Sequence, residues 1–229
     1  YRIENELNTQ FNTRKQLVLK TMYAYIDRRG SLYDTECLSL FGTNSFNLVW
    51  EKICAEIMDN QLDVPLGILK LPVPLKEDYN RRQKLIELIE KPLWTITGKC
   101  AKDTLIPDLV SICKVNDQHQ FIIFDAKYYN AHLEKGIVPT GQPGIESITK
   151  QYLYQLAYQR FIEDHKFSSV KNCFLLPTEN NEIEDKGEVR MEMLSNLGLQ
   201  DIKIRLIPAT MAYDLYLSGS KMDMERLDL

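Results

Sequence analysis

The stretch that decides the fold is "LIPDLVSICKVNDQHQFIIFDAKYYN" (Leu105–Asn130). Its centre, Phe121–Phe124, is apolar at every position, which predicts a strand covered on both faces by other elements. Charge then appears abruptly at Asp125 and Lys127, and Asp108 stands behind a proline near the start of the stretch. Charged side chains at the ends of buried strands either stabilise one another or carry out chemistry.

The spacing of these three residues favours a single cluster. Side chains two residues apart on a strand point to the same face, so Asp125 and Lys127 share a face. If "VNDQHQ" closes an antiparallel hairpin with an even loop centred between Asp117 and Gln118, Asp108 lies opposite Lys127 on that face. An odd loop would turn Asp108 to the other face unless a bulge restored the alternation.

Such a cluster has a recognisable chemistry. Two neighbouring carboxylates repel unless a cation lies between them. Mg²⁺ is the hard dication that suits one or two carboxylates and a substrate phosphate, with Mn²⁺ as the expected substitute. A lysine beside it would orient or deprotonate a water, or offset charge on phosphorus. The pattern therefore indicates phosphodiester hydrolysis, and the alternative interpretation is a salt bridge at a strand end.

Bulk composition restricts the class of protein. The 229 residues, 44% apolar and 26% charged, suit one soluble domain with a proper core. No apolar run approaches the roughly 20 residues of a membrane span, so no membrane partner is expected. The five scattered cysteines and three histidines predict neither disulfides nor a zinc site, and we expect a cytoplasmic protein. Because the sequence starts at Tyr1, we expect further residues to precede it.

Charge is unevenly distributed along the chain. The formal net charge is −4, yet Lys76–Lys102 holds seven basic and four acidic residues. A basic strip of this kind either follows a DNA backbone or is the solvated face of a helix.

The order of expected elements indicates an α/β sandwich around a mixed sheet. Phe46, Trp50, Ile53 and Ile57 recur at helical spacing, which predicts a helix that begins after Ser45. The other expected helices are 11–29, 145–164 and 209–217, with a mixture of helix and loop over 76–90. The expected strands are 93–97, 105–115, 120–128, 171–177, 187–194 and 201–207.

The motifs resemble those of a known superfamily. Pro107-Asp108 followed by Asp125-Ala126-Lys127 resembles the PD-(D/E)xK nucleases, which include many restriction endonucleases and RecB-type nucleases. "FGTNSFNLVWEKIC", "IPDLV", "FDAKYY" and "TKQYLYQLAYQ" together are similar to LlaJI-type restriction endonucleases, relatives of the nuclease subunit of McrBC systems. The resemblance implies a restriction-endonuclease-like three-layer sandwich, a central mixed sheet flanked by helices, over 41–229. Residues 1–40 would form an N-terminal helical segment.

The resemblance also implies roles for the clustered residues. Asp108 and Asp125 match the acids that bind the metal, and the main-chain carbonyl of Ala126 would complete the coordination. Lys127 matches the catalytic lysine. Glu51 matches the acid that the first core helix contributes; on a helical wheel it lies beside the polar boundary, and Glu56 is the alternative.

The helix expected at 145–164 carries another possible site residue. RecB-like members have a QxxxY motif there, on one face of the helix. In this chain Gln155, and not a tyrosine, stands four residues after Gln151. We therefore interpret Gln151 as a site residue, and Tyr154 and Tyr158 as core residues.

The implied function is that of a Mg²⁺-dependent endodeoxyribonuclease of a bacterial restriction-modification system, leaving 5′-phosphate and 3′-hydroxyl ends. Double-stranded DNA is the expected substrate, and cutting both strands calls for a homodimer or a second restriction subunit. The first alternative is a nuclease-like subunit that binds DNA or assembles a complex without cutting. The second is an unrelated α/β domain with an ordinary ion pair.

Overall fold

A mixed β-sheet lies at the centre of residues 45–229, the residues that the computed structural model describes. Its strand order is β3-β4-β5-β7-β6, with the two inner pairings parallel and the two outer ones antiparallel. The strands are β3 (Leu109–Val115), β4 (Gln118–Ala126), β5 (Ser169–Thr178), β6 (Glu184–Val189) and β7 (Ile202–Pro208). The helix predicted at 11–29 and the boundary predicted at residue 41 lie outside the described residues.

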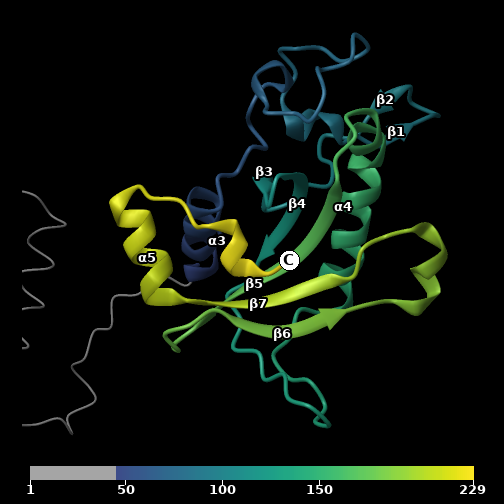
Figure 1. The fold of residues 1–229 in the computed structure, drawn as a ribbon. Coiled ribbons are helices and arrows are strands. Elements are labelled where there is room, and N and C mark those ends of the chain that lie inside the picture. The colour runs from purple at the N-terminus through teal and green to yellow at the C-terminus, as the bar shows by residue number, and fades with distance from the viewer. Residues whose placement is uncertain (1–44) are drawn as a thin grey trace, which may run out of the picture. The chain divides into compact units, whose positions relative to one another are not determined.

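Helices cover both faces of this sheet (Figure 1). Helices α3 (Phe46–Ile57) and α5 (Ala209–Ser218) pack on one face, and α4 (Ile145–Asp164) packs on the other. Residues of β4 alternate between the two cores: Ile122 lies in the core of α3 and α5, whereas Phe121 lies in the core of α4. The α/β three-layer sandwich and the doubly covered strand are confirmed.

Helix α4 joins two parallel strands, β4 and β5. A parallel pair needs a crossover connection, and a helix is the usual one. The helix begins at Ile145 and ends at Asp164, the bounds that its sequence predicted. Helix α4 therefore covers the face of the sheet opposite to α3 and α5, next to the ends of β4 and β5.

The β3–β4 hairpin differs by two residues from the predicted register. Val115 pairs with Gln118, so the loop is Asn116-Asp117 and is centred one residue earlier than expected. Both loop residues have positive φ, 48° and 64°, which Asn and Asp tolerate and which a tight hairpin turn requires. Continued past Leu109–Phe124, this register places Asp108 opposite Asp125, not opposite Lys127. A shift of two preserves the face, so the predicted grouping survives.

The outer edge of β3 is covered by the segment that follows α3. The main-chain N–H of Gln61 donates to the Val110 carbonyl at 2.8 Å, and the Asn60 side chain accepts from the Val110 N–H at 3.0 Å. The Ser111 hydroxyl donates to the Met58 carbonyl. These bonds hold the start of β3, and hence Asp108, against the end of α3.

Several predicted boundaries were wrong. The strand expected at 105–115 begins only at Leu109, after Pro107. The strand expected at 120–128 begins at Gln118 and ends at Ala126. Within 76–90 the regular element is one short 3-10 helix, Leu85–Leu88. The expected strand 187–194 lies instead at 184–189, and its pairing with β7 shifts register between Asp185 and Glu188, beside Gly187 (φ 81°).

The predicted single strand at 93–97 is a small hairpin. Strands β1 (Leu93–Trp94) and β2 (Lys99–Cys100) pair antiparallel and form a separate two-stranded sheet. Gly98 has a φ of 64°, a left-handed conformation that lets the chain reverse within four residues. Among the described helices, none is both long and apolar enough to cross a membrane.

Candidate active site

The three charged residues singled out in the sequence meet at one end of the sheet. Asp108 directly precedes β3, Asp125 stands near the end of β4, and Lys127 follows that strand. The Lys127 Nζ lies 2.6 Å from Asp125 Oδ1 and 3.4 Å from Asp108 Oδ2. The prediction that these side chains project from one face is confirmed.

Main-chain contacts fix the position of the cluster. The Ala126 N–H donates to Asp108 Oδ2 at 2.9 Å, which ties the two strand ends together. The Leu175 carbonyl of β5 accepts from the Lys127 N–H at 2.9 Å and from Trp50 Nε1 at 3.2 Å. Helix α3 and β5 therefore both hold the end of β4, so regular elements position the cluster although Asp108 and Lys127 lie just outside the strands.

Burial changes the acidity of Asp125. Its side chain is 7% exposed, and burial, followed by a hydrogen bond with Asp108 and the charge of Asp108, raises its pKa to about 7. The Lys127 ammonium acts in the opposite direction. Near neutral pH, Asp125 is therefore poised between its protonated and ionised forms, as is common at functional sites.

Lys127 remains a cation in this setting. Burial alone lowers its pKa, but the charges and hydrogen bonds of Asp125 and Asp108 outweigh burial and raise the pKa above its ordinary value. At neutral pH the side chain is an ammonium group that donates hydrogen bonds. Of the roles expected for it, orienting a water or offsetting charge fits this state, and deprotonating a water does not.

Glu51 and Glu56, the two alternatives on α3, have different surroundings. The pKa of Glu51 is raised first by burial and next by the charge of Asp108, while Lys127 opposes the shift, so Glu51 is electrostatically coupled to the cluster. Glu56 is bonded instead to Lys52 at 2.6 Å. The electrostatic coupling therefore favours Glu51 over Glu56, and the role taken from the resemblance stays a prediction.

Gln151 lies beneath the cluster, fully buried against β4. Its Nε2 donates to the Ile123 carbonyl at 2.7 Å and approaches Asn172 Oδ1 at 3.4 Å. Its Oε1 is buried and has no hydrogen-bond partner within residues 45–229. Asn172 in turn donates to Gln155 at 2.6 Å, so a buried amide network joins α4 to β5. The sequence signal for this network was the pair of glutamines one turn apart.

Tyr154 has a contact that its predicted core role did not include. The residue is 6% exposed, which confirms its place in the core. Its hydroxyl also donates to the Ile106 carbonyl at 2.9 Å, two residues before Asp108. Burial, then the charges of Asp125 and Asp108, raise its pKa to about 12, so the tyrosine lies within electrostatic reach of both acids.

The oxygen donors of the cluster suit a hard dication. Across residues 45–229, no group of three or more His, Cys, Asp or Glu side chains is arranged to hold a metal ion. Mg²⁺, however, is commonly held by one or two carboxylates with water and substrate phosphate. The Lys127 ammonium already occupies a cationic position between the two carboxylates. The donor set thus fits Mg²⁺ once a phosphate adds oxygens.

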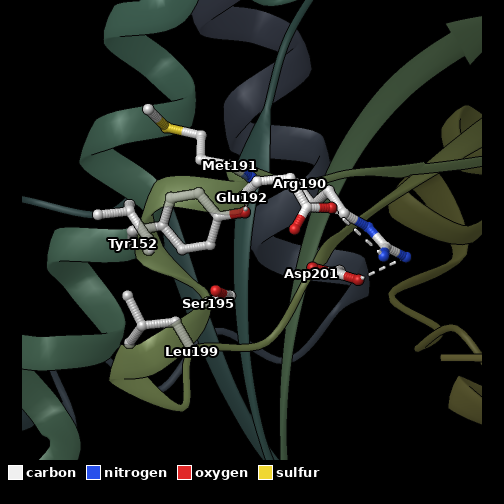
Figure 2. Close-up of a pocket in the computed structure, with 8 residues that line it drawn as sticks. Tyr152, Arg190, Met191, Glu192, Ser195, Leu199 and Asp201 are labelled. Carbon is white, nitrogen blue, oxygen red and sulfur yellow. Dashed lines mark hydrogen bonds and ion pairs between the residues drawn. The ribbon is translucent and has the colours of Figure 1, made fainter.

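A small pocket elsewhere on the protein is not part of this cluster. In Figure 2, Tyr152 and Arg190 face it from α4 and from the segment after β6. The Arg190 guanidinium is bonded to Glu188 at 2.8 Å and Asp201 at 3.2 Å, which leaves little charge for an anionic ligand. The lining residues are Tyr152, Arg190, Met191, Glu192, Leu194, Ser195, Leu199 and Asp201.

The fold and the acid pair at the strand ends define a protein of the restriction-endonuclease-like class. The chain belongs to the LlaJI restriction endonuclease family, whose model matches residues 2–213. It is 27% identical over 232 residues to the type II restriction enzyme BsuMI component YdjA of Bacillus subtilis (strain 168). That match covers 98% of this chain and 44% of the relative, so the chain spans less than half the relative's length. No solved structure matches the chain.

Proposed function

We propose that the chain is the nuclease domain of a restriction system, a Mg²⁺-dependent endodeoxyribonuclease with a PD-(D/E)xK site. The observation that supports this most directly is the cluster of Asp108, Asp125 and Lys127 at adjacent strand ends, with the pKa of Asp125 raised to about 7. Membership in a restriction endonuclease family makes DNA the expected substrate.

Each residue of the cluster has a distinct part. Asp108 and Asp125 would hold Mg²⁺ with the main-chain carbonyl of Ala126, and Glu51 would add negative charge nearby. When bound, Mg²⁺ supplies positive charge that makes water more acidic and offsets the charge that develops on the phosphoryl oxygens. The Ala126 N–H bond to Asp108 keeps this carboxylate in place during the reaction.

The proposed reaction is an in-line displacement at phosphorus. A water oxygen bonds to phosphorus, the bond from phosphorus to the 3′ oxygen breaks, and the water protons pass to solvent and to the leaving oxygen. The products are a 5′-phosphate and a 3′-hydroxyl. Lys127, an ammonium group, donates to the attacking water or to a phosphoryl oxygen, and such fixed donors lower the barrier.

Cutting both strands of a duplex needs two such sites. The BsuMI relative is described as a component of a restriction enzyme, and this chain spans 44% of it. We therefore propose that the working enzyme is a homodimer or includes a second restriction subunit. Restriction acts on DNA that enters the cell, which makes the cytoplasm the proposed location.

The test is cleavage of supercoiled plasmid by the 229-residue chain, alone and with its partner subunit. Nicked or linear DNA with 5′-phosphate ends should form with Mg²⁺ or Mn²⁺ and not with excess EDTA. Asp108→Asn should abolish cutting yet keep DNA binding, since the charge that holds the cation is lost. Asp117→Asn, the same change at the exposed far end of the β3–β4 hairpin, should leave the rate unchanged.

Intact plasmid in the presence of both cations and the partner subunit would contradict the proposal. With DNA binding retained, that result would indicate the alternative of a nuclease-like subunit that binds or assembles without cutting. Equal rates for Asp108→Asn and the wild type would show that the cluster is only an ion pair.

A further inference from the structure

The β1–β2 hairpin presents apolar and basic side chains to solvent and is not part of the central five-stranded sheet. Figure 1 shows it projecting away from the central sheet. Leu93, Trp94 and Ile96 are 60%, 64% and 95% exposed. Three large apolar side chains are thus exposed within four residues, and such a concentration marks an interaction site more often than a single exposed residue does.

Hydrogen bonds at the turn and at the base stabilise the hairpin despite its short strands. The Trp94 carbonyl accepts from the Thr97 and Gly98 N–H groups at 3.0 and 2.9 Å, which closes the turn. At the base, the Thr104 hydroxyl donates to the Glu90 carbonyl at 2.7 Å. A two-stranded hairpin alone is marginal in water, so these bonds are what preserve its shape.

One face of the hairpin combines an aromatic ring with a cation. Trp94 and Lys99 are paired across the two strands, and directly opposed residues of an antiparallel pair point to the same face. Lys91 and Lys102 flank them, so residues 91–102 hold three lysines and no acid. Within the described part of the chain, none of these three lysines forms an ion pair.

We infer that this hairpin binds double-stranded DNA beside the cleavage site, with Trp94 against bases and Lys99 on a phosphate. Basic charge matches a polyanion, apolar wedges insert between base steps, and aromatic rings stack on bases whatever their sequence. Residues 1–44 carry six basic and five acidic side chains, so this segment is not acidic overall and does not complement the charge of the hairpin as DNA does. The inference rests on the proposed nuclease function.

The hairpin lies within reach of a duplex bound at the acid cluster. Cys100 stands eight residues before Asp108, so the two are at most about 29 Å apart even in a fully extended chain. One turn of B-DNA is about 34 Å long. The hairpin is therefore separated from Asp108 by less than one turn of a duplex, a span that one bound DNA molecule can bridge.

The two tryptophans of the chain give a direct readout. Trp50 is fully buried and Trp94 is exposed, so acrylamide quenches the fluorescence of Trp94 selectively. We would titrate the 229-residue chain with a random-sequence 60-base-pair duplex in EDTA, where no cleavage occurs. DNA should protect the emission from acrylamide, and a Trp94→Phe variant, which reports Trp50 alone, should show no change.

Affinity measurements complete the test. Trp94→Ala should weaken duplex binding about 10-fold, while Trp94→Phe, which keeps a stacking ring, should bind nearly as the wild type does. Lys99→Ala should reduce the slope of log affinity against log salt by about 1. Leu217→Ala, at another exposed apolar residue, on α5, should have no effect.

Each contrary outcome is distinct. DNA binding that leaves Trp94 open to acrylamide and is unaffected by Trp94→Ala overturns the inference while the proposed nuclease function stands. If Trp94 is protected from acrylamide without DNA, at one or at all protein concentrations, the hairpin is covered by protein. That result also overturns the inference. A chain that neither binds nor cuts DNA overturns both.

Discussion

Lys127 and Arg205 are both largely buried cations of the central sheet, and the oxygens around them differ in kind. Arg205 donates mainly to main-chain carbonyls, which carry only partial charge, and to one carboxylate. Its partners are the carbonyls of Ile204, Leu227 and Asp228 and the carboxylate of Asp185. Arg205 therefore fixes the C-terminal segment to β7 with its charge balanced.

Lys127 is surrounded by an excess of negative charge. Asp125 and Asp108 lie 2.6 and 3.4 Å from its Nζ, and the charge of Asp108 also raises the pKa of Glu51. When all three acids are ionised, one ammonium group does not neutralise two carboxylates and a neighbouring glutamate. The difference teaches that the buried charge at Arg205 serves the fold, whereas the acids around Lys127 are those that we propose bind a further cation.

The largest expected effect is the loss of DNA cleavage in the variant Asp125→Asn. Loss of one cation-binding carboxylate should slow plasmid cutting by at least about 1000-fold, which corresponds to roughly 4 kcal/mol of barrier. Timed nicking assays with Mg²⁺ measure it. Arg205→Met should cut at the wild-type rate per folded chain; a comparable loss in that variant would erase the contrast between the two cations.

Arg205→Met should have the opposite effect: it should lower the stability of the fold and leave cleavage unchanged. Three carbonyls and a carboxylate lose a charged donor, which should cost about 3 kcal/mol, because hydrogen bonds to charged groups are stronger than neutral ones. For a domain of this size the melting temperature should fall by about 6–12 °C. Thermal unfolding followed by circular dichroism checks this, and an unchanged midpoint would show that Arg205 is not a structural tie.

Glu51 and Glu56 offer a matched pair on one helix. Glu51→Gln should reduce cleavage about 10- to 100-fold, because it removes negative charge that is coupled to the cluster. Glu56→Gln should leave the rate unchanged, since its carboxylate pairs with Lys52 at the surface. Steady-state cleavage rates at saturating Mg²⁺ decide the matter, and equal effects of the two substitutions would remove Glu51 from the site.

The raised pKa of Asp125 predicts how stability depends on pH. Its pKa rises from an ordinary 3.8 to about 7 in the folded protein, so the folded state binds this proton more tightly than the unfolded state does. Ionisation of Asp125 therefore destabilises the fold progressively as pH rises from 4 to 7, and fully above 7. Asp125→Asn should gain a few degrees in melting temperature over the wild type at pH 8 and little at pH 4.

Scanning calorimetry of both proteins in EDTA at several pH values measures this difference in melting temperature. A difference that is constant with pH, or that shrinks as pH rises, would mean that Asp125 is a stabilising ion-pair partner like Asp185. The comparison with Arg205 would then fail.

The smallest expected effect is that of Tyr154→Phe. The hydroxyl donates to the Ile106 carbonyl, so its loss should cost about 1 kcal/mol of stability and let the Asp108 segment shift. Cleavage should slow severalfold, with a higher Mg²⁺ requirement that a purely structural role would not produce. Tyr158→Phe is the control, because that hydroxyl has no hydrogen-bond partner among the described residues. Matching Mg²⁺ dependence in both variants would contradict a positioning role for Tyr154.

The parts of the fold that the sequence predicted are those with a strong periodic signal. Helix α4 was predicted at both ends, because Gly144 and the change after Asp164 bound a continuous helical pattern. The apolar run of β4 gave both the strand and its burial on two faces. The grouping of Asp125 with Lys127 followed from this strand alone, since side chains alternate along a strand, whereas Asp108 joined them only through the assumed even hairpin loop.

The parts that the sequence did not predict depend on local turn chemistry or on tertiary contacts. The hairpin register was wrong by two residues, because the positive φ of Asn116 and Asp117 set the turn rather than the whole polar stretch. The β1–β2 hairpin has no alternation to detect, since it is exposed on both sides. The contact of Tyr154 with Ile106 joins elements 48 residues apart, and no local pattern encodes it.

The most direct test of the central claim is a crystal of the 229-residue chain soaked in Mn²⁺ and measured for anomalous scattering. The account predicts one strong peak about 2.0–2.3 Å from carboxylate oxygens of both Asp108 and Asp125, with Lys127 displaced from at least one of them. A cation-saturated crystal without a peak there, in which Lys127 still bridges both acids, would contradict it.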